Sequence, residues 1–177
     1  MALELGPCQV VFDSEDIGKT LGGVIAKFSD DTQDLKSDQY GSSAEDTIIT
    51  GSNAEIEVPL AEIDFSKIAF ALNKTVFGTN AGVAGTNSVG TSLKAKGKEL
   101  ILKKYVDGAP STDEADWITF PLAAPKSDVE LSFNAEDQRV LKVTFKAFPS
   151  AVTANWGAAT TSAQTVLYFF GDSAATS

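Results

Sequence analysis

Apolar and polar residues alternate with a period of two along much of the chain, and this pattern most constrains the fold. Such alternation is typical of strands with one buried and one solvated face. It occurs at residues 55–58, 99–103, 128–133 and 141–146. Less regular alternation adds candidate strands at 9–12 and 23–28, and runs rich in aromatic and β-branched residues add two more at 117–122 and 165–170. The sequence therefore predicts a mainly β chain with eight or more strands.

One segment has helical spacing instead. Its apolar residues fall near one face of a helix over residues 59–72: Leu60, Ile63, Ile68 and Leu72. Asp64 can cap a shorter helix that starts at Phe65. We expect this to be the single helix, covering one face of a sheet.

The length of 177 residues suits a single domain over 1–177. Residues 29–46 are polar and acidic, and we expect a long loop between strands there. Long loops without structure of their own are uncommon in compact domains and usually have a function. The segment from residue 150 is rich in Ala, Thr and Ser. Within it, 165–170 is apolar enough to require pairing in the fold or with a neighbouring subunit.

The composition argues against an enzyme. The chain has no histidine and one cysteine, Cys8, so histidine-dependent triads, intrachain disulfides and cysteine-based zinc sites are excluded. Cys8 is interpreted as a small buried residue on the first strand. The acidic clusters at 13–16 and 113–116 lack the spacing of a calcium loop and are interpreted as solvated turns. We expect no catalytic residue, cofactor or metal.

The charge distribution limits the partners. The net charge of −10 disfavours binding to phosphate backbones and to anionic membrane surfaces. The N-terminus has neither a basic segment nor a long apolar run, so we expect no signal peptide and synthesis in a cytoplasm. Five lysines lie within residues 94–104, and we interpret them as a charged strand face that is solvated or faces an acidic partner.

Four motifs in the first third of the chain carry a resemblance when taken in order. They are Leu5-Gly6-Pro7, then Gly18-x-Thr20-x-Gly22-Gly23-Val24, then Asp38-Gln39-Tyr40-Gly41, and finally Leu60-Ala61-Glu62. The ordered set, over roughly residues 3 to 72, resembles the start of the major tail tube proteins of long-tailed bacteriophages with non-contractile tails (siphophages).

The resemblance implies a β-sandwich flanked by one helix. Six subunits would form a ring whose inner sheets join into one β-barrel, and rings would stack into a tube in the virion tail. Residues 29–46 would then be the stacking loop. The implied partners are the protein itself, a tape-measure protein, a tail terminator and tail-tip proteins. DNA would pass through the lumen without specific binding, and the lumen would be acidic, with Asp128 and Glu130 as candidate lining residues.

The opposite charges of the loop and the lysine-rich segment suggest a contact between rings. The candidate residues are Asp30, Asp31, Asp34, Asp38, Gln39, Tyr40, Lys94, Lys96, Lys98, Lys103 and Lys104. If this pairing dominates, salt should weaken the stacking of rings.

Two other functions remain open. One is a carbohydrate-binding or adhesin β-sandwich, for which Trp117, Trp156 and Tyr40 could stack on sugars, although buried roles suit these residues better. The other is a related inner-tube protein of a contractile tail or secretion system, which would need a sheath partner. Rings or tubes in solution would favour a tube protein, and a monomer with affinity for sugars would favour the adhesin.

Overall fold

The computed structural model describes residues 6–38, 41–74, 76–77, 82–83, 85, 89–131, 140–154 and 162–172. The strands are β1 (Cys8–Phe12), β2 (Glu15–Asp16), β3 (Ile25–Leu35), β4 (Asp46–Leu60), β5 (Val76–Phe77), β6 (Gly82–Val83), β7 (Lys98–Val106), β8 (Ala109–Pro110), β9 (Trp117–Leu131), β10 (Leu141–Ala147), β11 (Ser150–Ala154), β12 (Ser162–Val166) and β13 (Phe169–Phe170). The helix α1 is Phe65–Ala71, and short 3-10 helices lie at Lys94–Lys96 and Glu114–Asp116. The prediction of a mainly β chain with one α-helix is confirmed for the described residues.

One large antiparallel sheet contains nine of these strands. Its order is β2-β1-β7-β9-β10-β4-β3, with β13 also paired to β9 and β8 to β7. Two small sheets pair β11 with β12 and β5 with β6. The apolar run at 165–170 is therefore divided: its first residues end β12, whereas Phe169 and Phe170 pair with β9.

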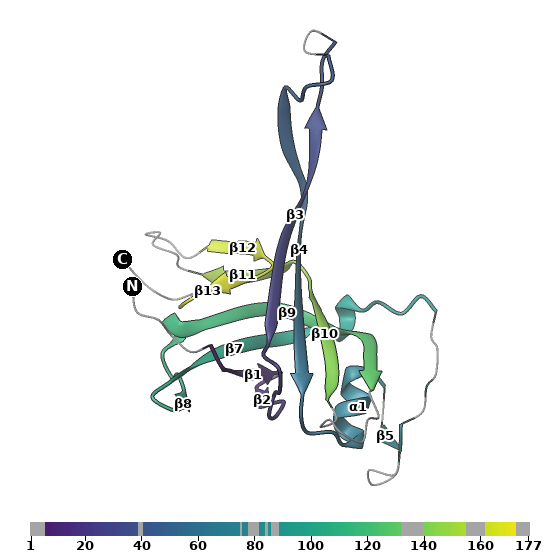
Figure 1. Cartoon of the computed structure of the whole chain (residues 1–177), viewed down its shortest axis with the longest axis vertical. Helices are drawn as coiled ribbons and strands as arrows, with labels where there is room; N and C mark the ends of the chain where they lie inside the picture. The colour runs from purple at the N-terminus through teal and green to yellow at the C-terminus, as the bar shows by residue number, and fades with distance from the viewer. Residues whose placement is uncertain are drawn as a thin grey trace.

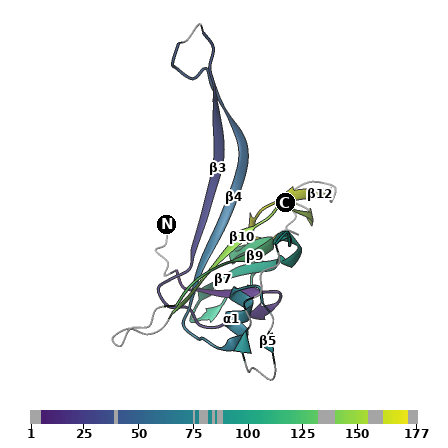
Figure 2. The ribbon, with the colours of Figure 1, turned by 90° about the vertical axis from the view of Figure 1, so that its right-hand side faces the viewer.

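The large sheet bends over itself (Figures 1 and 2). The rings of Phe12 in β1 and Phe145 in β10 lie 5.4 Å apart, although β7 and β9 stand between these strands in the sheet order. In a flat sheet three strand spacings would separate them by about 14 Å. The two-layered arrangement thus arises from one bent sheet, and the core lies between the two layers.

The strand β9 connects the layers. Its first half pairs with β7 and its second half with β10. The sequence predicts separate strands at 117–122 and 128–133, and that division is wrong, because one strand runs through the turn-like residues between them. The register against β10 shifts between Val143 and Phe145, next to Pro125, so the strand accommodates the proline at an irregularity of the ladder.

The predicted alternation places the core. Ile56, Val58 and Leu60 of β4 and Leu141, Val143 and Phe145 of β10 are fully or almost fully buried, while the residues between them are more exposed. The helix α1 covers this core, with Phe70 4.9 Å from Phe12 between ring centres.

The predicted helix is too long at its start. Leu60 belongs to β4, where its backbone pairs with Leu141, so 59–60 are strand rather than helix. The shorter alternative is confirmed: α1 begins at Phe65, and the Asp64 carboxylate accepts a hydrogen bond of 2.7 Å from the backbone N–H of Lys67. This cap satisfies one of the backbone donors left open at a helix start.

The predicted loop at 29–46 is mostly strand. β3 extends to Leu35 and β4 begins at Asp46, and the two pair antiparallel from Ile25 and Glu57 out to Leu35 and Asp46. These polar residues form strands because their side chains hydrogen-bond across the strand pair. The sequence prediction relied on apolar alternation, and that pattern does not reveal such polar pairs. Only about residues 36–45 connect the strands.

Candidate assembly surface

The outer part of the β3–β4 hairpin stands apart from the body of the molecule (Figures 1 and 2). β10 pairs with β4 only at residues 55–60, so residues 46–53 pair with β3 alone among the described residues. We call residues 29–35 and 46–53 the ribbon. Its seven-residue arm in β3 extends about 24 Å. An isolated two-stranded ribbon is marginally stable in water, so this one requires local support or a partner.

Local support comes from polar contacts across the ribbon. Ser52 Oγ donates a hydrogen bond of 2.6 Å to Asp30, and Asn53 Nδ2 donates one of 2.8 Å to Asp31. Thr47 Oγ1 donates one of 2.9 Å to Asp34. Three of the predicted contact acids are therefore held in place on the ribbon, whereas Asp38 lies beyond the end of β3 and is exposed.

Apolar side chains are exposed on both faces of the ribbon. Leu35 is 44%, Ile48 42% and Ile49 66% exposed. Ile48 is paired with Gln33 and Ile49 with Thr32, and successive strand residues point to opposite faces. A ribbon in water is expected to be polar on both faces, and these three residues depart from that expectation.

A β-bulge interrupts the ribbon between the part that carries Leu35, Ile48 and Ile49 and the part nearest the body of the molecule. Asp31 pairs with Gly51 but Thr32 pairs with Ile49, so Thr50 is the extra residue. Its hydroxyl donates to the Asp31 carbonyl over 3.1 Å. Bulges increase the local twist of a strand pair and re-aim its side chains, so this one sets the direction of Ile48 and Ile49.

The five predicted contact lysines do not form one free surface. Lys98 pairs with Asp13 at 3.1 Å, and Lys96 donates to the Asn73 carbonyl over 3.0 Å. Lys103 lies 4.0 Å from the centre of the Trp117 ring. An acidic ribbon that docked here would compete with partners inside the chain, so the charge pairing between rings stays a prediction.

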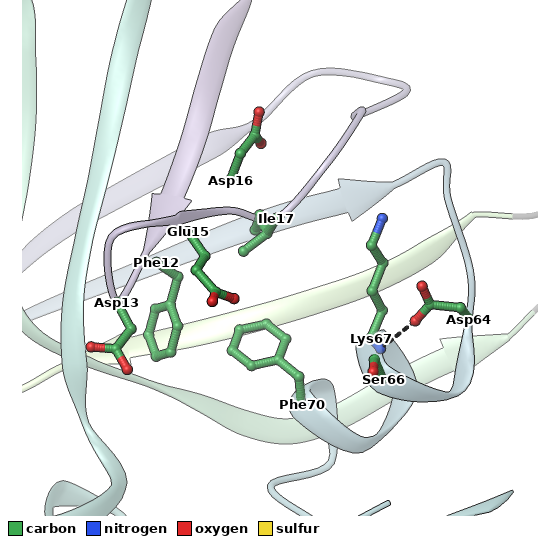
Figure 3. Close-up of a pocket in the computed structure, with 9 residues that line it drawn as sticks. All are labelled: Phe12, Asp13, Glu15, Asp16, Ile17, Asp64, Ser66, Lys67 and Phe70. Carbon is green, nitrogen blue, oxygen red and sulfur yellow. Dashed lines mark hydrogen bonds between the residues drawn. The ribbon is translucent and has the colours of Figure 1, made fainter. Parts of the chain in front are cut away.

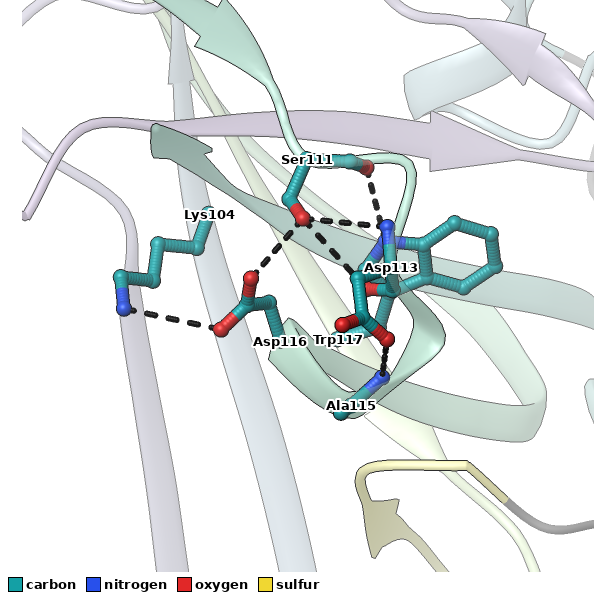
Figure 4. Close-up of polar contacts among 6 residues, drawn as sticks. All are labelled: Lys104, Ser111, Asp113, Ala115, Asp116 and Trp117. Carbon is teal, nitrogen blue, oxygen red and sulfur yellow. Dashed lines mark hydrogen bonds and ion pairs between the residues drawn. The ribbon is translucent and has the colours of Figure 1, made fainter. Parts of the chain in front are cut away.

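The partner of Lys104, Asp116, lies in a polar network (Figure 4). Asp116 is 3.6 Å from Lys104 and accepts a hydrogen bond of 2.9 Å from Ser111 Oγ. Trp117 Nε1 donates to the Ser111 carbonyl over 2.9 Å, and Asp113 caps the 3-10 helix by accepting from Ala115 N. The acids of 113–116 thus order the connection between β8 and β9.

An open cavity of about 380 Å³ lies between the β1–β2 turn and α1 (Figure 3). Phe12 and Phe70 form its floor, and carboxylates stand around it. Two of these carboxylates already accept hydrogen bonds within the chain. Asp64 caps α1, and Asp16 accepts hydrogen bonds of 2.7 Å from Gln9 Nε2 and 2.9 Å from Gly18 N. Among the described residues, no group of three His, Cys, Asp or Glu side chains is placed to hold a metal ion.

Cys8 lies half-buried on β1. Burial raises the pKa of its thiol, which opposes the thiolate form that reactive cysteines need. The residue packs against the core, as the sequence predicts for a small residue on the first strand.

Several predicted residues lie outside the part that the structure describes. These are Gln39 and Tyr40 of the contact set and Trp156 of the sugar-binding alternative. The backbones of Asp128 and Glu130 lie in β9, but their side chains are outside the described part.

Sequence reasoning missed an aromatic patch at the root of the ribbon. Phe28, Tyr168 and Phe170 lie with ring centres 4.4 to 5.7 Å apart, and Phe170 is 62% exposed. The aromatic run at 168–170 was the available signal, but only the fold brings it beside Phe28. Trp117, in contrast, is partly buried, with its indole N–H bonded.

Comparison with known proteins gives no match: no protein-family model matches the chain, and neither does any curated protein. Among the described residues, no helix is both long and apolar enough to cross a bilayer. The features that bear on function are therefore the ribbon, the edges of the large sheet and the motifs of the first third.

Proposed function

We propose that the chain is a structural subunit of a siphophage tail tube. Copies associate into hexameric rings, and the rings stack into a hollow conduit for DNA. The role is passive and involves no catalysis. The motifs between residues 5 and 62 support the proposal from the sequence, and the ribbon supports it from the structure.

The observation that carries the proposal is the free-standing ribbon with apolar side chains on both faces. Ile48 and Ile49 remain exposed among the described residues, on a ribbon that extends away from the body (Figure 1). A second copy of the chain supplies the cover. A protruding element that docks on a different surface of the next copy makes a heterologous contact, which closes into rings or propagates into filaments. The ribbon then takes the stacking role that the resemblance implies for 29–46.

The sheet edges fit assembly as well. β3 is an edge strand of the large sheet, and at the opposite edge β2 covers only Val11 and Phe12 of β1. Exposed edges invite pairing with other chains. Edge-to-edge association of copies around a ring pairs these edges and builds the continuous barrel of the proposed tube.

The remaining partners follow from the proposed function. A tape-measure protein sets the tube length, and a terminator and tip proteins bind its two ends. The acidic chain suits a conduit because it disfavours tight binding of phosphates.

The test uses a double variant, Ile48→Asp/Ile49→Asp, with Val106→Asp as control. Val106 lies in β7 outside the ribbon and is 41% exposed, which matches the 42% of Ile48. We expect wild type and control to form rings or tubes in negative-stain images, while the ribbon variant stays dispersed with unchanged circular dichroism. Assembly of the ribbon variant like wild type would contradict the proposal.

A carbohydrate-binding role has one observation in its favour, the exposed ring of Phe170 beside Tyr168 and Phe28. Exposed aromatic faces can stack on sugars. A wild type that remains monomeric at high concentration and binds glycans in a Phe170-dependent manner would favour this function over the tube.

A further inference from the structure

The outer face of the layer formed by β9, β10, β4 and β3 carries a row of lysines and glutamates. Glu57 of β4 lies 2.5 Å from Lys27 of β3 and 3.0 Å from Lys142 of β10. Glu55, also in β4, lies 3.2 Å from Lys126 of β9. We call these five residues the ladder.

The backbone register builds the ladder from alternation alone. Glu55 and Glu57 point away from the core because Ala54, Ile56 and Val58 point into it. The Cα partners of Glu55 are Lys27 on one side and Lys146 on the other. Glu57 has Ile25 and Thr144 as its Cα partners, and it reaches Lys27 and Lys142 diagonally across the same face. Cross-strand and diagonal neighbours of opposite charge attract.

The ladder pairs three lysines of this face, Lys27, Lys126 and Lys142, with two carboxylates. Lys146 lies on the same face, and without Glu55 and Glu57 the four lysines would form a basic patch on a chain whose net charge is −10. Lysines bind DNA by replacing the counterions around its phosphates. A lysine already paired with a carboxylate has to give up that pair first, so it gains less from a phosphate.

We propose that this face lies against a passing polyanion, duplex DNA, and that Glu55 and Glu57 keep its lysines from holding the DNA. An unpaired lysine face would retain the duplex. Lysines paired with Glu55 and Glu57 hold phosphates less tightly, which suits a surface along which DNA has to slide. The inference rests on the proposed function, because it identifies which sheet face the conduit exposes.

The experiment removes the two carboxylates. The variant Glu55→Gln/Glu57→Gln is compared with Glu15→Gln/Glu99→Gln, which changes the net charge equally. Glu15 and Glu99 are exposed and show no ion pair within the described part of the chain. The readout is fluorescence anisotropy of a labelled 30-base-pair duplex at 50 mM salt, measured on dispersed protein.

We expect the ladder variant to bind DNA about tenfold tighter than the control variant, with a steeper loss of affinity as salt rises, equivalent to about two more phosphates. Equal affinity of the two variants would overturn the inference, as would a wild type that already binds as tightly as the ladder variant. The single variant Glu57→Gln serves if the double variant does not fold, and it should show an intermediate gain.

Negative-stain images of the same samples separate this inference from the proposed function. Tubes without a gain in DNA affinity would overturn the ladder's role and leave the tube intact. A gain in affinity in a protein that never assembles would support lysine neutralisation by the ladder and contradict the tube.

Discussion

The ribbon and the root of β4 belong to one strand pair, yet they are stabilised in opposite ways. At the root, Ile56 and Val58 are buried and flanked by strands on both sides. In the ribbon, Ile48 and Ile49 are exposed and are held by one neighbouring strand and by polar contacts. Strand pairing alone contributes little without burial. Residues 55–60 of β4 are thus stabilised by burial in their own chain, whereas the ribbon has only its strand pairing and polar contacts, and we propose that a second copy covers it.

The largest effect is expected in the core. Phe145→Ala removes a fully buried ring that contacts Phe12 and Phe70. We expect it to lower the free energy of unfolding by about 3–5 kcal/mol, because the transfer free energy of the ring is lost and the cavity left behind adds a further cost. Urea unfolding of the dispersed protein measures this. A loss below 1 kcal/mol would show that the layers do not pack around this ring.

The comparison within β4 is the sharpest. Ile56→Ala should lower the free energy of unfolding by about 2–5 kcal/mol, while Ile49→Ala should change it by less than about 0.5 kcal/mol. The two substitutions remove the same atoms from the same strand, so burial is what differs. Similar losses in dispersed protein would break the distinction between ribbon and root.

A smaller effect is expected at the helix cap. Asp64→Ala removes the acceptor for the Lys67 N–H and should lower the free energy of unfolding by about 1 kcal/mol. Asp64→Asn serves as the matched control and should retain most of the stability, since its side-chain oxygen can cap as well. Equal losses in both variants would assign the effect to charge instead of capping.

The smallest effect is a dependence on pH. The hydrogen bonds from Lys27 and then Lys142 lower the pKa of Glu57 in the folded state. The ionised Glu57 therefore stabilises the fold fully above a pH of about 4.3, the ordinary pKa of glutamate. This contribution is lost as the pH falls through the lower pKa that Glu57 has in the folded state. On acidification, the thermal unfolding temperature of the Glu57→Gln variant should therefore fall less steeply than that of the wild type. Parallel curves would indicate that these ion pairs add nothing.

Much of the body could be predicted from the sequence. Alternation located β1, β7, β10 and the inner half of β4, and Asp64 marked the start of α1. The ribbon could not be predicted, because its strands are held by Asp, Ser, Asn and Thr contacts across a distance of about twenty residues, and such residues are typical of loops. The lysines at 94–104 were predicted to form one charged strand face, but Lys94 and Lys96 lie in a 3-10 helix and only Lys98, Lys103 and Lys104 lie in β7. Their partners Asp13, Asp116 and Trp117 are brought to them only by the fold.

Hydrogen–deuterium exchange can show whether assembly covers the ribbon. Amides of residues 46–53 should exchange rapidly in dispersed protein and become protected on assembly, while those of 55–60 should be protected in both states. We expect the gain in protection to be concentrated in the ribbon. Assembled protein in which 46–53 still exchanges as fast as in dispersed protein would contradict it.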